Sequence, residues 1–276
     1  LVDMSSTNYS LATAVPFEQV CSGVSPIASM KAVKNKVEQD GFRAAMLRDG
    51  VAVVKFLAWL KSAVEAGGQT EISLDDRLTA LRAEQPKFKG ISFDTIVGYE
   101  AHGAIVHYEA TPETDIPVQP HGLVLIDSGA QYLDGTTDIT RTIALGELSE
   151  EQRRVYTLVL KGHIQLDRCR FPAGACGSQI DALARAPMWR EGYNYMHGTG
   201  HGVGSYLNVH EGPHQIRMEW RPAPLQAGMT VTNEPGIYLE GKFGVRIENT
   251  LLTVPAESTA FGDFLKFETL TLAPID

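Results

Sequence analysis

The sequence predicts an α+β fold, because helices and strands occur in two successive sets without a strict βαβ alternation. Apolar residues recur every three or four positions over 42–64, whereas the period shortens after Ile91 and glycine and proline divide short apolar runs. Two stretches further along resemble each other. Asp127 and Asp138 are expected on the two strands of one hairpin, and Glu234 and Glu248 on the two strands of another. We therefore expect two related halves that face each other.

A long helix is predicted after a lead-in segment over 1–33, which contains two prolines. Asn35 and Glu38 have the spacing of an N-cap and a capping box, and Gly67 is suited to end the helix. Its apolar positions keep the helical spacing apart from one step filled by glycine, and they are Phe42, Met46, Val53, Leu57, Leu60 and Val64. We expect this helix to bury one face.

A shorter helix and three strands are predicted next. The helix follows Ser73 and closes near Pro86. The strands are expected over 91–97, 104–108 and 123–126, where glycine and proline separate apolar runs.

Helices are again predicted in the second half of the chain. Ser149 and Gln152 form a capping pair for one helix, and Ser178 is expected to begin another that Pro187 must kink or end. From Gly228 onward, strands and turns alternate.

Composition excludes several classes of protein. The 276 residues are 43% hydrophobic and 21% charged, which is ordinary for a globular protein, and the net charge of −9 argues against a nucleic-acid surface. No apolar run approaches the roughly 20 residues of a membrane span, and the start lacks the features of a signal peptide. Three cysteines without Cys-x-x-Cys spacing favour reduced thiols and a cytoplasmic location. Because the first residue is Leu, we expect a fragment of a longer protein.

Carboxylates in apolar strand or turn contexts are the main candidates for chemistry. They occur in four segments: IDSGAQYLDGTTDITR (126–141), HGTGHGVGSYLNVHEGP (197–213), TNEPGIY (232–238) and GVRIENT (244–250). A carboxylate on a strand such as LVLID is costly to bury unless it is paired or bound to metal. Four of them beside His201 would repel one another, and two divalent cations would neutralise them. An oxygen-rich set with one imidazole suits Mn²⁺ better than a structural zinc site.

Each candidate also has a purely structural interpretation. Asp127 precedes Ser-Gly and Glu234 precedes Pro-Gly, so both can be turn residues. Asp138 can cap a turn, and Glu248 can be an exposed strand charge. His201 is harder to explain in this way, because the surrounding glycines add nothing to a core but allow close approach to a ligand.

These segments resemble the pita-bread metallopeptidases, the family of methionine aminopeptidase, prolidase and aminopeptidase P. The resemblance is greatest to the catalytic domain of cytosolic-type Xaa-Pro aminopeptidase (aminopeptidase P), and it runs from Ala32 to Pro274. It implies a catalytic domain over 34–276 with two pseudo-symmetric helix-strand halves around a curved antiparallel sheet. It also implies two metal ions, Mn²⁺ with Zn²⁺ or Co²⁺ as alternatives. The implied ligands are Asp127, Asp138, His201, Glu234 and Glu248.

The resemblance assigns further residues to the substrate. It implies catalytic and substrate-binding roles for His107, His197, His210 and Arg246, and a pocket role for Tyr238. From the residues alone, His107 and His210 can equally be core histidines, and Arg246 can be a surface residue that pairs with Glu248.

The expected activity is hydrolysis of the N-terminal X–Pro bond of peptides by a metal-bridged hydroxide, with Glu234 as general base. The expected partners are peptides with proline in second position, and we expect a homodimer of the full-length protein. The alternatives are prolidase or methionine aminopeptidase activity, a metal-free creatinase, or a non-catalytic binding module of the same fold. The sequence departs from the family pattern in three ways. In the family, two creatinase-like domains usually precede the catalytic domain and the chain continues past the position of Asp276, so we expect further segments on both sides. Pro187 occupies a position where relatives have a continuous helix.

Overall fold

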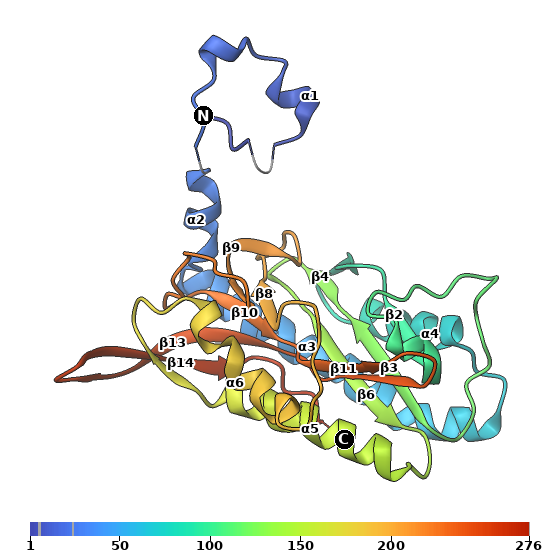
Figure 1. Cartoon of the computed structure of the whole chain (residues 1–276). Coiled ribbons are helices and arrows are strands. Elements are labelled where there is room, and N and C mark those ends of the chain that lie inside the picture. Colours follow the sequence, from blue (N-terminus) through green and yellow to red (C-terminus); the bar gives the residue numbers. More distant parts are fainter. Residues whose placement is uncertain (5–6, 24, 276) are drawn as a thin grey trace.

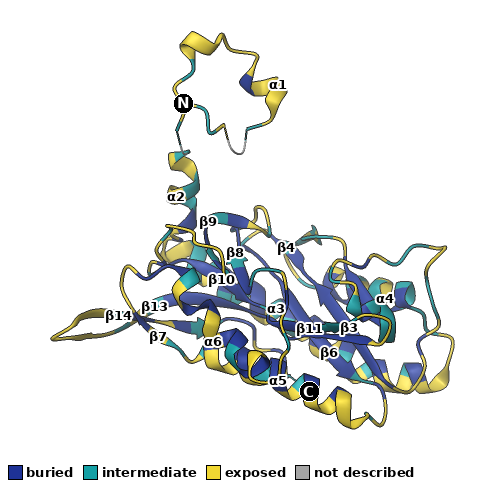
Figure 2. Cartoon of the chain, viewed as in Figure 1, coloured by how far each residue is buried: buried dark blue, intermediate teal, exposed yellow. Residues whose placement is uncertain are grey.

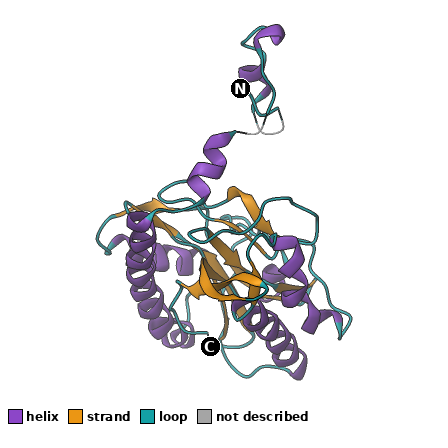
Figure 3. Ribbon diagram, turned by 90° about the vertical axis from the view of Figure 1, so that its left-hand side faces the viewer, coloured by secondary structure: helices purple, strands orange, loops and turns teal. Residues whose placement is uncertain are grey.

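Antiparallel strands form the centre of the molecule and long helices cover the outside (Figure 1). The computed structural model describes residues 1–4, 7–23 and 25–275, so Asp276, the last residue of the expected catalytic domain, lies outside the described residues. Turned by 90°, the curled strands lie between helices on both flanks (Figure 3). All ladders between the named strands are antiparallel. The predicted α+β, pita-bread fold is confirmed.

Eight helices are described. Six are α-helices, α1 (Tyr9–Ala12), α2 (Pro26–Ala32), α3 (Lys36–Ala66), α4 (Glu71–Ala83), α5 (Glu150–Asp167) and α6 (Gly177–Trp189), and two are 3₁₀ helices, η1 (Phe17–Gln19) and η2 (Glu100–Ala104). None of the described helices is long and apolar enough to span a membrane.

The two longest helices begin where the capping signals place them. At the start of α3, the Asn35 side chain accepts hydrogen bonds from two backbone N–H groups, and Glu38 returns a bond to the Asn35 backbone. Ser149 and Gln152 make the same reciprocal pair at the start of α5. Helix α3 ends at Gly67, whose φ of 82° favours glycine. Both predictions are confirmed.

The two shorter helices differ from the prediction at their ends. Helix α4 is capped by Thr70 and begins before Ser73, which instead completes the capping box. Helix α6 begins at Gly177 rather than Ser178, and it continues through Pro187 to Trp189. Pro187 lies in the last turn with its ring buried, so the missing N–H costs only a bond near the helix end.

The strands form four antiparallel sheets, which together make the curled surface. Their bounds are β1 (Phe88–Ile91), β2 (Ile96–Tyr99), β3 (Leu123–Ser128), β4 (Ala130–Tyr132), β5 (Gly135–Thr136), β6 (Ile139–Ala144), β7 (Arg170–Pro172), β8 (Gly200–Gly202), β9 (Glu211–Ile216), β10 (Thr230–Asn233), β11 (Gly236–Leu239), β12 (Phe243–Arg246), β13 (Asn249–Thr259) and β14 (Gly262–Thr269). The orders are β1-β4-β5, β2-β3-β6, β11-β12 and β7-β14-β13-β10-β8-β9.

Two of the predicted strands are wrong in whole or in part. The strand expected over 91–97 is divided between β1 and β2, and the strand expected over 104–108 is the end of η2 followed by a turn. Buried Glu71 explains the second departure. It accepts hydrogen bonds from the backbone of Tyr99 (2.8 Å) and the hydroxyl of Tyr108 (3.0 Å), and it contacts His102 Nδ1 at 3.0 Å. These contacts from a distant helix draw the segment into a compact turn.

The similarity between the two carboxylate-bearing stretches is confirmed in the topology. Strands β3 and β6 pair with each other and flank the β4–β5 hairpin. Strands β10 and β13 likewise pair and flank the β11–β12 hairpin. Each half therefore carries its two carboxylates on or beside the paired strands, close to where the chain enters and leaves the hairpin.

Helices cover the sheet on both sides, and the core lies between them (Figure 2). One apolar cluster joins α3 and α4 to β2, β3 and β6, with Phe56 and Val124 among its buried members. Another joins α5 and α6 to β11 and β12, with Val159 and Val245 among them. The three cysteines are free thiols, as predicted. Each pair of helices therefore packs against its own group of strands.

Candidate functional site

One cavity of about 540 Å³ gathers nine of the ten predicted site residues. These nine are His107, Asp127, Asp138, His197, His201, His210, Glu234, Arg246 and Glu248. Tyr238 is not in the lining, but it contacts two residues that are. The fold therefore brings together segments that are up to 141 positions apart in the sequence, from His107 to Glu248.

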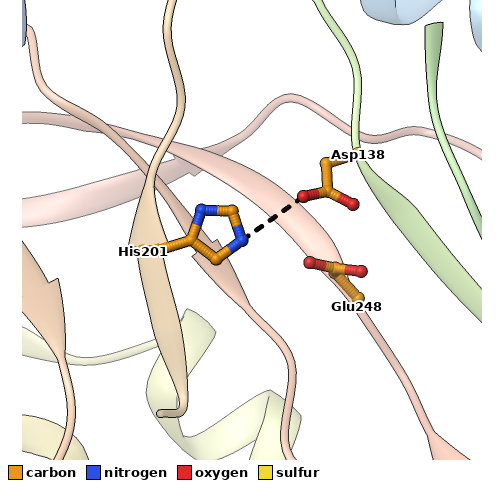
Figure 4. Close-up of side chains that lie close together, drawn as sticks. All are labelled: Asp138, His201 and Glu248. Atoms are coloured by element: carbon orange, nitrogen blue, oxygen red, sulfur yellow. Dashed lines mark ion pairs between the residues drawn. The ribbon is translucent and has the colours of Figure 1, made fainter. Parts of the chain in front are cut away.

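The four carboxylates come from equivalent places in the two halves. Asp127 lies on β3 and Asp138 directly precedes β6, while Glu234 directly follows β10 and Glu248 directly precedes β13. Ligand atoms of Asp138, His201 and Glu248 lie within 4.8 Å of one another (Figure 4). Asp138 and Glu248 are 3% and 1% exposed, which excludes the interpretation of Glu248 as an exposed strand charge.

His201 projects from β8 into the carboxylates. Its Nε2 lies 3.4 Å from an oxygen of Asp138 and 3.4 Å from an oxygen of Glu234, while its Nδ1 is 2.9 Å from the carbonyl oxygen of Gly202. A Cβ at Gly200 would collide with the backbone of β10, and one at Gly202 with the backbone of β9. The glycines on either side of His201 thus let three strands approach closely, as the glycine-rich motif predicts.

Burial and mutual repulsion dominate the electrostatics of this group. Burial raises the pKa of Glu234 to about 7, with a further contribution from Asp138, and it raises the pKa values of Asp138 and Glu248 in the same direction. Burial opposes the protonation of His201, but its hydrogen bond to Asp138 and the charges of Glu234 and Asp138 outweigh that effect. The pKa of His201 is therefore raised to about 9. The cluster is short of positive charge.

Arg246 supplies one positive charge, and it does so at Asp127. Its Nε and Nη2 donate to Asp127 Oδ2 at 3.1 and 2.6 Å. Arg246 is 2% exposed, so the alternative of a surface residue that pairs with Glu248 is wrong. The other oxygen of Asp127, Oδ1, is buried and has no hydrogen-bond partner among the described residues.

Tyr238 links Arg246 to His197. Arg246 Nη1 donates to the Tyr238 hydroxyl at 2.7 Å, and that hydroxyl lies 2.9 Å from His197 Nε2. His197 Nδ1 lies 2.7 Å from the carbonyl oxygen of Gly198. Burial, with the positive charges of Arg246 and Arg185, lowers the pKa of His197 to about 4. A neutral ring donates from Nδ1 and accepts the tyrosine proton at Nε2.

His107 and His210 are exposed and line the cavity, so neither is a core histidine. The His210 ring meets the His201 ring edge to face, with centroids 4.1 Å apart. Although part of the residue is exposed, desolvation of its ring at the cavity wall and the charge of His201 lower the pKa of His210 to about 4. A neutral imidazole therefore stands beside the cluster.

Thirteen further residues line the cavity. They are Phe93, Asp94, Ile96, Val106, Tyr108, Glu109, Gly198, Gly200, Val209, Glu211, Gly212, Gln215 and Arg217. Five of them lie in the HGTGHGVGSYLNVHEGP segment, and the other eight lie outside the four segments singled out in the sequence. Glu211 had a signal, because it directly follows His210 in the HEGP segment.

Known proteins share both the sequence and the fold. The sequence profile of metallopeptidase family M24 matches residues 40–255. Aminopeptidase P1 of Arabidopsis thaliana is 46% identical over 299 residues, which cover 99% of this chain and 46% of the plant protein. A probable Xaa-Pro aminopeptidase P of Laccaria bicolor is 49% identical over 257 residues, which cover 91% of this chain and 40% of the fungal protein.

Solved structures give the same picture. X-prolyl aminopeptidase of Caenorhabditis elegans, described as a cytosolic enzyme with a di-nuclear active site, aligns with a TM-score of 0.90 and 42% identity, covering 97% of this chain and 44% of that one. Prolidase of Pyrococcus furiosus aligns with a TM-score of 0.82 and 28% identity, and the alignment covers 98% of this chain and 74% of the prolidase chain. The chain spans less than half the length of these curated aminopeptidases. The family profile covers most of the chain, and this protein chain therefore belongs to metallopeptidase family M24.

Proposed function

We propose that this chain is the catalytic part of a metal-dependent aminopeptidase that hydrolyses the bond between an N-terminal residue and a following proline. This proposal rests on one observation above all: four carboxylates and His201 line a single cavity, and ligand atoms of Asp138, His201 and Glu248 lie within 4.8 Å of one another. The names of the plant and fungal relatives support the substrate class. The partners are therefore peptides with proline in second position.

Asp127, Asp138, His201, Glu234 and Glu248 would hold two divalent cations. Oδ1 of Asp127 is buried and has no hydrogen-bond partner in the described part of the chain, and the pKa values of Glu234 and Glu248 are raised, so the site is short of positive charge. Such a group is costly in its ionised form unless cations neutralise it. The oxygen-rich donor set favours Mn²⁺, with Zn²⁺ or Co²⁺ as alternatives.

The residues of the chain then have distinct tasks in the reaction. When bound, two divalent cations supply Lewis-acid polarisation and lower the pKa of water. Glu234 accepts the proton of the attacking water as general base. His210, neutral near pH 7, offers a ring N–H to the developing oxyanion. Arg246 holds Oδ2 of Asp127, which leaves Oδ1 for the metal site.

His107, His197, Tyr238 and Arg246 would shape the space for the proline ring and the chain beyond it. The hydrogen bonds from Arg246 through Tyr238 to His197 support this assignment, because they keep the His197 ring in one orientation. A proline in second position removes the N–H of the scissile bond and restricts φ. A rigid pocket suits such a substrate.

The proposal extends to the protein as a whole. We assign residues 34–276 to the catalytic domain and 1–33 to a lead-in segment, and we expect a homodimer of the full-length protein. The Caenorhabditis elegans relative is described as cytosolic, which supports a cytoplasmic location for this protein.

The activity is tested with peptides that differ at one feature. After Mn²⁺ loading, we expect release of the first residue from an X-Pro-Ala tripeptide, and no release from X-Ala-Ala or from the N-acetylated form. Mass spectrometry of the products measures each rate. Cleavage restricted to X-Pro dipeptides would mean prolidase activity, and preferential release of methionine from Met-Ala-Ala would mean methionine aminopeptidase activity. If metal binds but no peptide is cleaved, the binding-module alternative is correct.

A further inference from the structure

A buried lysine, Lys34, connects the segment that precedes α3 with the strand that follows His210. Its Nζ lies 2.6 Å from Glu211 Oε1, and the side chains of Lys34 and Glu211 are only 1% and 4% exposed. The two residues are 177 positions apart. Lys34 lies outside residues 40–255, the part matched by the family profile. None of the site motifs contains it.

The backbone of Lys34 is fixed independently of this ion pair. Its N–H donates to the carbonyl oxygen of Gly228 at 2.9 Å, and its own carbonyl oxygen accepts from Gln39 Nε2 at 2.7 Å. Val33 forms a β-bridge with Met229, just before β10. The lysine therefore projects from a rigid base toward Glu211.

Glu211 is the neighbour of His210 and the first residue of β9. It lines the cavity, and its backbone pairs with Gly202, next to His201. Lys31 approaches the second carboxylate oxygen at 3.3 Å, but its side chain is 39% exposed. Lys34 is thus the desolvated partner of this carboxylate. Removing one member of a buried pair leaves an uncompensated charge, which is much less favourable than removing both members.

We propose that Lys34 is a positioning residue for His210. By neutralising Glu211 inside the protein, Lys34 keeps the start of β9 in place, and His210 stays beside His201. Without Lys34, the Glu211 carboxylate turns toward water and carries the adjoining residue with it. The expected effect on kcat rests on the proposed function, whereas the expected ordering of the start of β9 does not.

The test compares Lys34→Met with the double variant Lys34→Met/Glu211→Gln. In the full chain loaded with Mn²⁺, we expect Lys34→Met to lower kcat on an X-Pro-Ala peptide about tenfold to a hundredfold, with little change in KM. Metal content should stay the same. Hydrogen exchange should become faster in peptides that cover residues 207–215. The double variant should recover most of both losses, because no charge is left unpaired.

Lys36→Met is the matched control, since Lys36 is a nearby lysine whose ion pair with Asp40 is exposed. It should change neither kcat nor exchange at 207–215. The inference is overturned if Lys34→Met keeps its kcat and local exchange, or if the double variant is no better than the single one. If wild type cleaves no X-Pro peptide, the proposed function fails, and the exchange measurement still decides whether Lys34 orders the segment.

Discussion

His201 and His210 lie side by side but differ in their surroundings. His201 faces two carboxylates, and the pKa of its ring is raised to about 9. His210 faces the cavity, and the pKa of its ring is lowered to about 4. Opposite pKa shifts in neighbouring groups are typical of a site whose members have different roles. The two can be separated experimentally.

We expect His210→Ala to lose turnover and to keep its metal. An oxyanion donor acts mainly in the transition state, so kcat should fall about 10²–10³-fold with little change in KM. Steady-state kinetics and elemental analysis on the same preparation measure both quantities. The free energy of unfolding should stay within about 1 kcal/mol of wild type. Loss of metal or of the fold in this variant would mean that His210 is a ligand or a structural residue.

In contrast to His210→Ala, we expect Asp138→Asn to lose metal. Asp138 contacts His201 and lies beside Glu248, so replacing its carboxylate should weaken the cation site. Wild type should approach two metal equivalents after Mn²⁺ loading and desalting, and the variant should hold fewer. Plasma emission spectrometry provides the count. An unchanged stoichiometry would remove Asp138 from the ligand set.

At the scale of the element, α6 holds the segment that carries His197. Arg185 on this helix pairs with Asp181 one turn earlier at 2.6 Å, and it donates to the carbonyl oxygens of Tyr195 and His197 at 2.6 and 2.9 Å. Asp181 also accepts the hydroxyl proton of Thr199 at 2.5 Å. Asp181 and Arg185, one turn apart on α6, therefore hold the HGTGH motif in place through these hydrogen bonds.

Arg185→Met should consequently lower the free energy of unfolding by about 3–5 kcal/mol, because Asp181 would be left as an unpaired buried charge. Chemical denaturation measures the change. Arg154→Met is the control, since Arg154 on α5 pairs with Glu191 at the surface, and its loss should lower the free energy of unfolding much less than the loss of Arg185. Equal effects of the two substitutions would contradict the role given to α6.

At the scale of the whole molecule, the buried carboxylates and His201 make the stability of the metal-free fold depend on pH. Because the pKa of His201 is raised to about 9, the folded metal-free protein holds a proton there that the unfolded chain loses above pH 6.5, and the raised pKa of Glu248 acts in the same direction. Stability therefore falls as pH rises. The contribution of His201 is complete below pH 6.5, the ordinary pKa of histidine, and it is lost as pH rises through about 9.

We expect the melting temperature of EDTA-treated protein to decrease from pH 7 to pH 9. The loss of stability that His201 contributes is on the order of 2 kcal/mol over this range. Scanning calorimetry with and without Mn²⁺ measures the effect, and the loaded protein should show a flatter profile because cations replace the protons. Equal slopes for the two forms would contradict a shared site for protons and metal.

Local sequence was sufficient for much of the fold. The capping pairs Asn35–Glu38 and Ser149–Gln152 involve residues three positions apart, so their geometry is set within one helical turn. The candidate site residues could also be predicted from the sequence, because four short segments carry most of them and a family resemblance identifies the pattern. Nine of those ten residues line one cavity.

The sequence by itself determined the type of each long element and the segments whose residues line the cavity. Tertiary structure alone decided their partners. It paired Arg246 with Asp127 rather than Glu248, folded 104–108 into a turn around Glu71, and placed Lys34 against Glu211. The physical reason is distance along the chain. Capping and periodicity depend on neighbours within about four residues, whereas a buried charge finds its partner through sheet register and helix packing across the whole molecule.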